Sequence, residues 1–128
     1  MFPIDQDTPR FSRAMFESIS DIIRERQLDD NYTAWFDHDT MDFIGDEGRV
    51  YIKIYDRSLV IPYIVLKHTR VGTATKLFER LKAIAKELAL TEFKVLGVQS
   101  EAMEKFCLKQ GFSVDGKPSC NNYAYYLN

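Results

Sequence analysis

The sequence predicts an α+β fold in which an antiparallel meander, a central parallel strand pair and flanking helices share one mixed sheet. Three apolar, strand-like runs follow one another across short turns between residues 41 and 67, and short connections favour antiparallel pairing. A strongly amphipathic stretch then separates the last of these runs from a further strand candidate. Because a helical crossover joins parallel strands, we expect these two strands to lie side by side and parallel.

Length and composition indicate one folded domain, spanning residues 1–128. The chain contains 45% hydrophobic residues, which excludes a disordered protein, and it is long enough to bury a core without disulfides. Cys107 and Cys120 are too few for a secreted disulfide scaffold, and no Cys/His spacing suggests a metal site. We therefore expect a cytoplasmic protein. No signal segment or run of membrane-spanning length is present, so we expect neither export nor membrane insertion.

The formal net charge of −2 hides an asymmetry along the chain. Residues 1–72 carry nine Lys or Arg against thirteen Asp or Glu, a net charge of −4, and residues 73–128 carry eight against six, a net charge of +2. Without a broad basic surface, a nucleic-acid partner is not expected. Seven acidic residues occur with no Lys or Arg between them: Asp29, Asp30, Asp37, Asp39, Asp42, Asp46 and Glu47. Such a run is typical of a solvated loop, but over a binding cleft it would favour a cationic amine.

A first helix is predicted from Thr8-Pro9, a capping side chain followed by a proline in the first turn. Apolar residues at helical spacing carry it to about Gln27; they are Phe11, Met15, Ile19, Ile22 and Ile23. Asp29-Asp30-Asn31 ends the pattern, and residues 32–36 form a short extended segment. Its Trp35 is expected to anchor the core, because large aromatic side chains usually do.

The predicted strands and second helix follow in order. Strands are expected over residues 41–45, 49–55 and 58–67, with turns at 46–48 and 56–58, then a helix over 73–90 and a strand over 92–98. A last helix begins near Ser100, a possible cap, and ends at Gly111, after which Phe112 continues a C-terminal capping motif. Residues 112–114 and 123–127 form a closing strand pair across the turn at 115–118.

The junction Thr69-Arg70-Val71-Gly72-Thr73-Ala74 lies where an apolar strand gives way to the amphipathic helix. The small residues Gly72 and Ala74 let a ligand approach the first helical turn. The unpaired N–H groups and positive dipole end of that turn favour an anion such as a phosphate. A glycine between strand and helix is also common in proteins that bind nothing there, so both interpretations stay open.

This order of elements resembles the GNAT family of acyl-CoA N-acyltransferases, over residues 41–128 and most clearly over 58–112. The family's pyrophosphate-binding turn reads Gln or Arg, two variable residues, Gly, one variable residue, and Gly or Ala. Here Gly72 and Ala74 match, and Thr69 stands in place of the Gln or Arg. The resemblance implies a GNAT-like mixed sheet and acetyl-CoA as co-substrate. Its pyrophosphate would be held by Arg70, Val71, Gly72, Thr73 and Ala74, with a hydroxyl contact from Thr73 or Thr75.

The resemblance also implies a role for the preceding strand. In GNAT enzymes its backbone pairs with the pantetheine arm and presents an N–H to the thioester carbonyl, which would stabilise the developing oxyanion. In this chain that segment is residues 63–66, so Ile64 and Leu66 are candidate cofactor-binding residues. The attacking amine must lose a proton. Tyr63 on the same strand is a candidate catalytic residue for this step, with Asp56 and Glu92 as alternatives.

Cys107 is the second candidate catalytic residue. When Gly111-Phe112 is matched to the Gly-Phe ending of the family's last helix, Cys107 falls where many members have a tyrosine that protonates the departing CoA thiolate. A cysteine can in principle donate a proton. A single cysteine on an apolar stripe with Ala102, Met103 and Phe106 is also typical of core packing.

Three functions are compatible with this sequence. The first is an acyl-CoA-dependent N-acyltransferase, in which the primary amine of a small molecule, a protein lysine or an N-terminus attacks acetyl-CoA directly. The second is a catalytically silent GNAT-like binding or assembly protein, and the third is an α+β interaction protein whose turn only resembles a phosphate cradle. In the first case Tyr123, Tyr125 and Tyr126 would line the acceptor cleft, and His68 would lie close to the phosphate. We expect a monomer or a homodimer.

Overall fold

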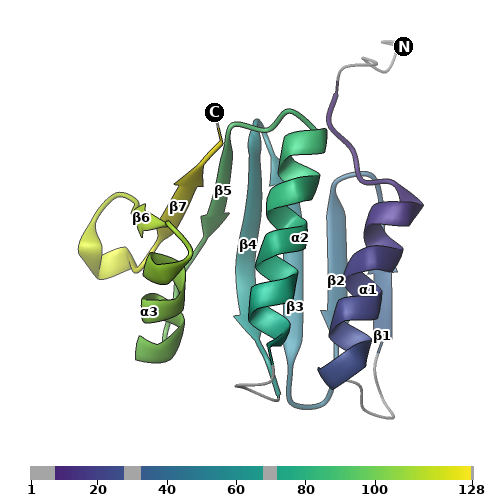
Figure 1. Cartoon of the computed structure of the whole chain (residues 1–128), viewed down its shortest axis with the longest axis horizontal. Coiled ribbons are helices and arrows are strands. Elements are labelled where there is room, and N and C mark those ends of the chain that lie inside the picture. The colour runs from purple at the N-terminus through teal and green to yellow at the C-terminus, as the bar shows by residue number, and fades with distance from the viewer. Residues whose placement is uncertain (1–7, 28–32, 68–71, 128) are drawn as a thin grey trace.

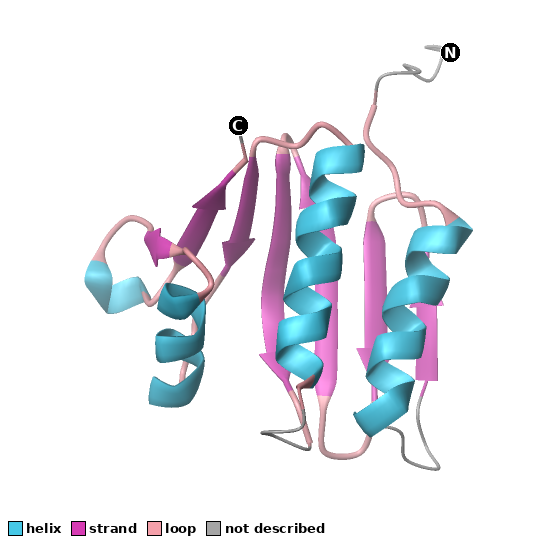
Figure 2. Cartoon of the chain, viewed as in Figure 1, coloured by secondary structure: helices cyan, strands magenta, loops and turns pink. Residues whose placement is uncertain are grey.

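The chain folds into one seven-stranded mixed sheet flanked by helices (Figure 1, Figure 2). A computed structural model describes residues 8–27, 33–67 and 72–127. The strands are β1 (Thr33–Phe36), β2 (Thr40–Ile44), β3 (Arg49–Tyr55), β4 (Ser58–Val65), β5 (Glu92–Val95), β6 (Ser113–Val114) and β7 (Tyr123–Tyr126). The helices are α1 (Arg13–Gln27), α2 (Thr73–Glu87) and α3 (Glu101–Lys109), with a short 3-10 turn at Pro118–Cys120. The α+β fold class is confirmed.

The sheet runs in the order β1-β2-β3-β4-β5-β7-β6. Strands β1 to β4 form an antiparallel meander, as the short turns between them predict. Strand β5 lies parallel to β4, with Ser58 beside Glu92 and Ile61 beside Val95. Because α2 connects these two strands, it is the crossover helix that the parallel pairing requires. Strands β7 and β6 then extend the sheet in antiparallel pairing.

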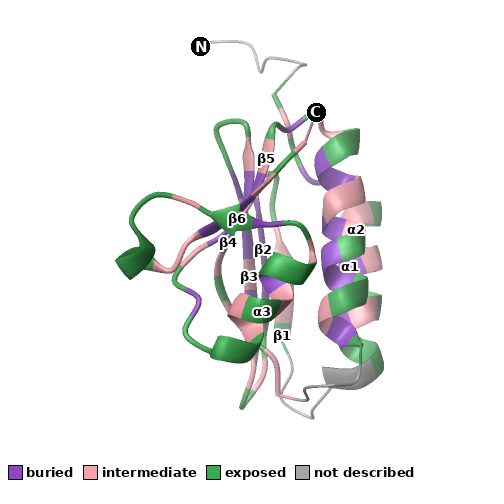
Figure 3. Ribbon diagram, turned by 60° about the vertical axis from the view of Figure 1, so that its left-hand side comes forward, coloured by how far each residue is buried: buried purple, intermediate pink, exposed green. Residues whose placement is uncertain are grey.

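Helices α1 and α2 pack side by side on one face of the sheet (Figure 1, Figure 3). Their apolar stripes meet the inward side chains of the strands, and the largest fully buried residues come from both layers: Ile19, Ile23, Met41, Phe43, Ile52, Leu59, Ile61, Leu77, Phe78, Leu81, Ile84 and Phe93. The opposite face of β1–β4, which we call the open face, carries large side chains that are half exposed. These are Trp35, Ile44, Tyr63 and Val65.

Trp35 lies on this open face with 45% of its surface exposed. The prediction that it anchors the core is wrong, because side chains alternate along a strand and its neighbours Ala34 and Phe36 take the core side. Trp35 is paired in register with Asp42 of β2. The open face therefore begins with an aromatic ring beside a carboxylate.

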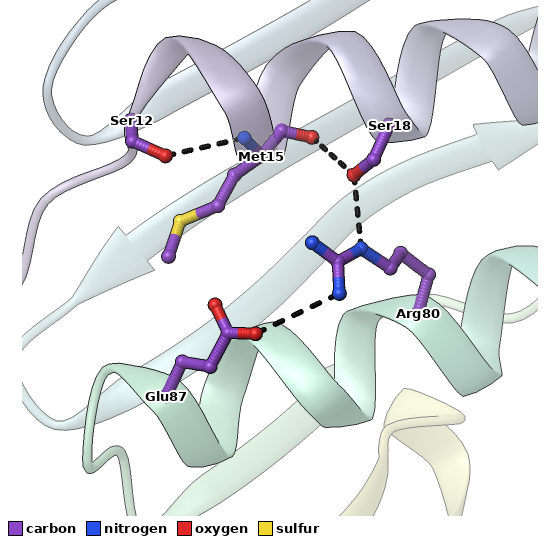
Figure 4. Close-up of polar contacts among 5 residues, drawn as sticks. All are labelled: Ser12, Met15, Ser18, Arg80 and Glu87. Carbon is purple, nitrogen blue, oxygen red and sulfur yellow. Dashed lines mark hydrogen bonds and ion pairs between the residues drawn. The ribbon is translucent and has the colours of Figure 1, made fainter.

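Helix α1 is capped by Ser12, whose Oγ accepts a hydrogen bond of 3.2 Å from the Met15 N–H (Figure 4). The helix begins at Arg13, so the predicted start at Thr8-Pro9 is wrong. The residues before the cap are not helical because Phe11 is buried and its N–H donates to the carbonyl of His38 at 2.7 Å. This bond ties the entry of the helix to the β1–β2 turn.

A polar bridge joins α1 to α2 (Figure 4). The Nε of Arg80 donates to Ser18 Oγ at 2.9 Å, and the Ser18 hydroxyl donates in turn to the Met15 carbonyl at 2.7 Å. Arg80 Nη1 also lies 3.7 Å from a carboxylate oxygen of Glu87 on its own helix. The bridge fixes the position of α1 relative to α2.

Helix α3 begins and ends as its sequence predicts. The Ser100 hydroxyl accepts a hydrogen bond of 3.1 Å from the Met103 N–H. At the other end Gly111 has φ 93°, and the Phe112 N–H donates to the Cys107 carbonyl at 3.0 Å. This is the bonding pattern of a glycine C-cap, in which glycine is favoured because it adopts the left-handed conformation without a steric clash. In the described part of the chain, no helix has the length and apolar character needed to cross a membrane.

Candidate functional site

A cleft of about 660 Å³ opens between the carboxyl ends of β4 and β5. Its walls come from four places: the second half of β4, the chain after β5, the start of α2 and the exposed side of α3. The lining residues are Pro62, Tyr63, Ile64, Val65, Leu66, Gly72, Thr73, Ala74, Thr75, Leu96, Gly97, Val98, Gln99, Ser100, Ala102, Met103 and Phe106. The lining is mostly apolar, which suits a long ligand with few charges along its middle.

The cleft exists because β4 and β5 separate. Their registered pairing covers Ser58–Ile61 and Glu92–Val95, and the Leu96 N–H adds a last bond of 3.0 Å to the Ile61 carbonyl. The chain after β5 then turns away at Gly97, which has φ 57° and whose N–H donates to the side chain of Asn122 at 2.9 Å. Because residues 62–65 continue β4 without β5 beside them, their backbone edge faces the cleft.

A bulge in β4 changes which residues face the core. Tyr63 pairs with Tyr51 but Val60 pairs with Lys53, so Ile61 and Pro62 together oppose the single residue Ile52. Before the bulge the odd-numbered residues Leu59 and Ile61 are buried in the core. After it the even-numbered Ile64 and Leu66 pack on the core. Tyr63 and Val65 consequently turn to the open face, at the rim of the cleft.

The start of α2 forms the polar end of the cleft. Gly72 is the N-cap of this helix, with φ 84° and no side-chain capping bond. A Cβ added at Gly72 would meet no atom within 4 Å, so the space before the helix is open. No acidic side chain lies in the first turn of α2, which leaves its positive dipole end uncompensated there. This end of the cleft can therefore accept an anion.

Helix α3 supplies a wall that the sequence assigns to the core. Ala102, Met103 and Phe106 form part of the cleft lining, and Phe106 packs edge-on against Phe78 of α2 with ring centroids 4.9 Å apart. Their helical spacing alone cannot separate a core stripe from a cleft wall. The sequence signal for a cleft here is Gly97, which lies two residues after the end of β5 and turns the chain away from β4.

The structure brings together most of the candidate cofactor-binding residues. Six of the eight line the cleft, together with the catalytic candidate Tyr63; the six are Ile64, Leu66, Gly72, Thr73, Ala74 and Thr75. Arg70 and Val71, with Thr69 and His68, lie outside the described residues. The lining does not include Asp56, Glu92, Tyr123, Tyr125 or Tyr126. Among the described residues that form it, Tyr63 is the only one with a titratable side chain.

The acidic run does not overhang the cleft where it is described. Asp42 is buried and lies under Arg49, at 2.8 Å from one guanidinium nitrogen, and Glu47 pairs with Lys67 at 3.4 Å. Neither Asp nor Glu occurs among the described lining residues. Asp29 and Asp30 lie outside the described part of the chain. The described lining of the cleft therefore offers no carboxylate of this run to attract a cationic amine.

Cys107 lies in the core, fully buried, and is not part of the cleft lining. Burial, with a smaller contribution from Glu104, raises the pKa of its thiol from the ordinary 9.0 to about 11. Because the unfolded chain loses this proton more readily than the folded one, the thiol adds stability below about pH 9 that is lost as the pH rises towards 11.

This pKa shift leads to a testable difference between two proteins. Between pH 9 and 11, the free energy of unfolding of the natural chain should fall by about 2 kcal/mol more than that of a Cys107→Ala variant. Chemical denaturation at a series of pH values measures this difference. If the free energy of unfolding fell equally in the two proteins over this pH range, the pKa of the Cys107 thiol would not be raised by burial.

Comparisons with known proteins give matches among solved structures alone. No model of a protein family matches the chain, and no curated protein matches it. The N-acetyltransferase PaiA from Thermoplasma acidophilum, in complex with coenzyme A, is 18% identical over 69% of this chain and 60% of its own, with a TM-score of 0.56. Less than two thirds of PaiA is therefore matched.

Two further structures match over nearly the whole chain. A GNAT-family acetyltransferase from Staphylococcus aureus is 13% identical over 93% of this chain and 97% of its own, with a TM-score of 0.54. Ard1 from Thermoplasma volcanium is 17% identical over 93% of this chain and 95% of its own, with a TM-score of 0.53. The strand order, the separation of β4 from β5 and these structural similarities together show that the chain has the fold of the GNAT acetyltransferases.

Proposed function

We propose that this protein is an acyl-CoA-dependent N-acyltransferase that transfers the acetyl group of acetyl-CoA to a primary amine. The observation that carries this proposal is the cleft itself, in which the unpaired half of β4 leads to the open start of α2. An apolar channel that ends in an anion-accepting helix terminus matches a ligand with a long thin arm and a pyrophosphate. The bound coenzyme A in the PaiA structure supports the same assignment.

In this proposal the pyrophosphate lies at the start of α2. Backbone N–H groups of Gly72, Thr73 and Ala74 would donate to its oxygens, with a hydroxyl contact from Thr75 and further contacts from Arg70 and Val71. Gly72 suits this position because its left-handed conformation and missing side chain keep the helix end open. The pantetheine arm would then run along residues 63–66, between Ile64 and Leu66 on one side and Met103 and Phe106 on the other.

The chemistry requires little from side chains. An N–H of the 63–66 segment, directed at the thioester carbonyl, stabilises the negative charge that develops when the amine attacks, a contribution of about 10²–10³ in rate. The C–N bond forms as the C–S bond breaks, and the amine releases one proton while the thiolate gains one. Tyr63, at the rim of the cleft, is our candidate for moving that proton, with water as the carrier. Cys107 has no part in this transfer because its thiol lies in the core.

The silent binding protein is the second candidate function. It is favoured by the scarcity of titratable side chains in the described lining, where Tyr63 stands alone. Such a protein would hold acetyl-CoA without passing the acetyl group on. Both candidates predict the same cofactor site and differ only in turnover.

Titration of the purified protein with acetyl-CoA by calorimetry tests the cofactor site. Thiol release, measured with a panel of amines comprising a polyamine, a lysine peptide, a peptide N-terminus and free amino acids, then tests transfer. We expect saturable binding, amine-dependent release of thiol, and a loss of about tenfold or more in release for Tyr63→Phe at unchanged acetyl-CoA affinity. Absence of acetyl-CoA binding would overturn both candidates. Binding without thiol release for any amine would select the silent protein.

A further inference from the structure

An ion pair with a buried carboxylate and a partly exposed guanidinium lies on the open face of the sheet, next to the cleft. Asp42 of β2 is only 3% exposed. Its two carboxylate oxygens accept hydrogen bonds from Arg49 of β3, at 3.0 Å from Nε and 2.8 Å from Nη2. The Arg49 guanidinium also lies over the ring of Tyr51, 5.3 Å from its centroid. Arg49 is thus held from two sides while 44% of its side chain stays exposed.

Stability alone is a weak reason for this pair. Removing a carboxylate from water is costly, and a hydrogen-bonded partner roughly offsets the cost without exceeding it, so apolar side chains would serve a sheet face equally well. What the pair achieves is orientation. Asp42 and the Tyr51 ring fix the plane of the guanidinium and the direction of its outer edge.

That outer edge remains available to a ligand. A guanidinium has five N–H donors arranged as two forks, and Asp42 occupies the fork made by Nε and Nη2. The fork made by Nη1 and the second N–H of Nη2 has no partner among the described residues. Its spacing matches the two oxygens of a carboxylate, which makes paired hydrogen bonds there.

The fork lies one strand away from the proposed reaction centre. In the β3–β4 register Arg49 is beside Val65, and Tyr51 is beside Tyr63. Val65 and Tyr63 both line the cleft, and neighbouring strands are about 4.8 Å apart. The raised pKa of Arg49, caused first by Asp42, includes a smaller contribution from Tyr63, which agrees with this proximity.

The open face is also the side from which an acceptor can approach. Helix α2 covers the other face of the sheet (Figure 3), and α3 contacts α2 through Phe106 and Phe78. A cofactor bound at the start of α2 and along α3 fills the cleft from that side. The amine must then arrive past Tyr63 and Val65, over the surface where Arg49 lies.

We propose that the free fork of Arg49 binds the carboxylate of a small amino acid and thereby holds its amine at the mouth of the cleft. This role in acceptor binding rests on the acyl transfer proposed above. The proposed acceptor carries a negative charge near its amine, in contrast to the cationic amine that the acidic run would favour. Arg49 is a substrate-binding residue in this assignment, and Asp42 is a positioning residue.

Carboxylate binding can be tested without turnover. The probe is N-acetylglycine, which has a carboxylate and no free amine, and its matched control is N-acetylglycinamide. Two-dimensional ¹⁵N NMR at constant ionic strength follows the Arg49 Nε–H and the indole N–H of Trp35, the single tryptophan of the chain. We expect saturable shifts at both groups in the millimolar range with the acid, and binding at least about tenfold weaker with the amide.

Variants separate the fork from a general charge effect. Arg49→Lys keeps the charge and a partner for Asp42 but has no second fork, and Asp42→Asn/Arg49→Gln removes both charges without leaving a buried carboxylate alone. Both should weaken acid binding about tenfold or more, seen in the Trp35 shifts. Lys53→Gln, on the same strand and the same face, should leave it unchanged. Equal binding of acid and amide, no saturable binding, or unchanged binding in both Arg49 variants would overturn the proposal.

The acetyl-CoA titration of the same samples keeps the two proposals distinct. The Arg49 variants should bind acetyl-CoA as the natural chain does, because Arg49 is not part of the cleft lining. If the natural chain does not bind acetyl-CoA, the proposed acyltransferase function is wrong. If it binds acetyl-CoA but not N-acetylglycine, only the proposed carboxylate site is wrong.

Discussion

Replacement of Gly72 by aspartate should weaken acetyl-CoA binding by about tenfold or more. The side chain would place a negative charge at the N-cap of α2, in space that is open in the structure. Two like charges about 6 Å apart at an effective dielectric constant of about 20 repel by roughly 3 kcal/mol, which solvent reduces at an exposed position. Calorimetric titration with acetyl-CoA measures the change.

The matched control is Gly72→Asn. Asparagine has nearly the same shape as aspartate, and both tolerate the left-handed conformation that Gly72 adopts with φ 84°. The two variants therefore share any backbone strain and any crowding, and differ by one charge. If both variants bound acetyl-CoA with equal affinity, the pyrophosphate would not lie at the start of α2.

Truncation of Phe78 to alanine should lower the free energy of unfolding by about 3–5 kcal/mol, as deletion of a fully buried aromatic ring does. Phe78 has no exposed surface. Its ring packs on Phe93 of β5, Phe106 of α3 and Phe112 after it, with centroids 5.3, 4.9 and 5.6 Å away. Chemical denaturation gives the loss of stability, and acetyl-CoA affinity should fall as well because Phe106 is a wall of the cleft.

Phe43→Ala distinguishes loss of the cleft wall from loss of stability in general. Phe43 is also buried, but it comes from β2 and packs on Phe16 of α1, with centroids 5.4 Å apart. We expect a comparable decrease in stability and no change in acetyl-CoA affinity, measured at a temperature where both variants are folded. If both variants lost the same acetyl-CoA affinity, packing against Phe78 would not be what holds Phe106 in place as a wall of the cleft.

Local patterns predict the fold of this chain well. Strand β3 has the predicted bounds, and the caps at Ser100 and Gly111 are where the sequence indicates, because each depends on neighbouring residues only. Trp35 shows where such patterns fail. Its size predicts burial, yet exposure depends on whether a helix covers that face of the sheet, which is set by residues far away in the chain.

The functional site was harder to predict than the fold, because it too depends on residues that lie far apart in the chain. Gly72 and its neighbours could be recognised from a local motif, but Phe106 becomes a cleft residue only because β5 leaves β4 after Ile61. Asp42 is the converse case. Within an acidic run it has the pattern of a solvated loop residue, and its burial follows from pairing with Arg49 across the β2–β3 turn.

The bulge at Ile61 and Pro62 gives β4 one residue more than regular alternation against β3 allows. Deletion of that single residue would restore regular pairing and leave Tyr63 and Val65 on the open face, whereas straightening the strand without a deletion would turn them inward and Ile64 and Leu66 outward. The extra residue is therefore what allows Leu59 and Ile61 to face the core on one side of the bulge and Ile64 and Leu66 on the other. Natural variants of this protein should therefore carry any one-residue change in the length of β4 at the bulge, where the flanking residues keep their faces, rather than in the paired stretches on either side.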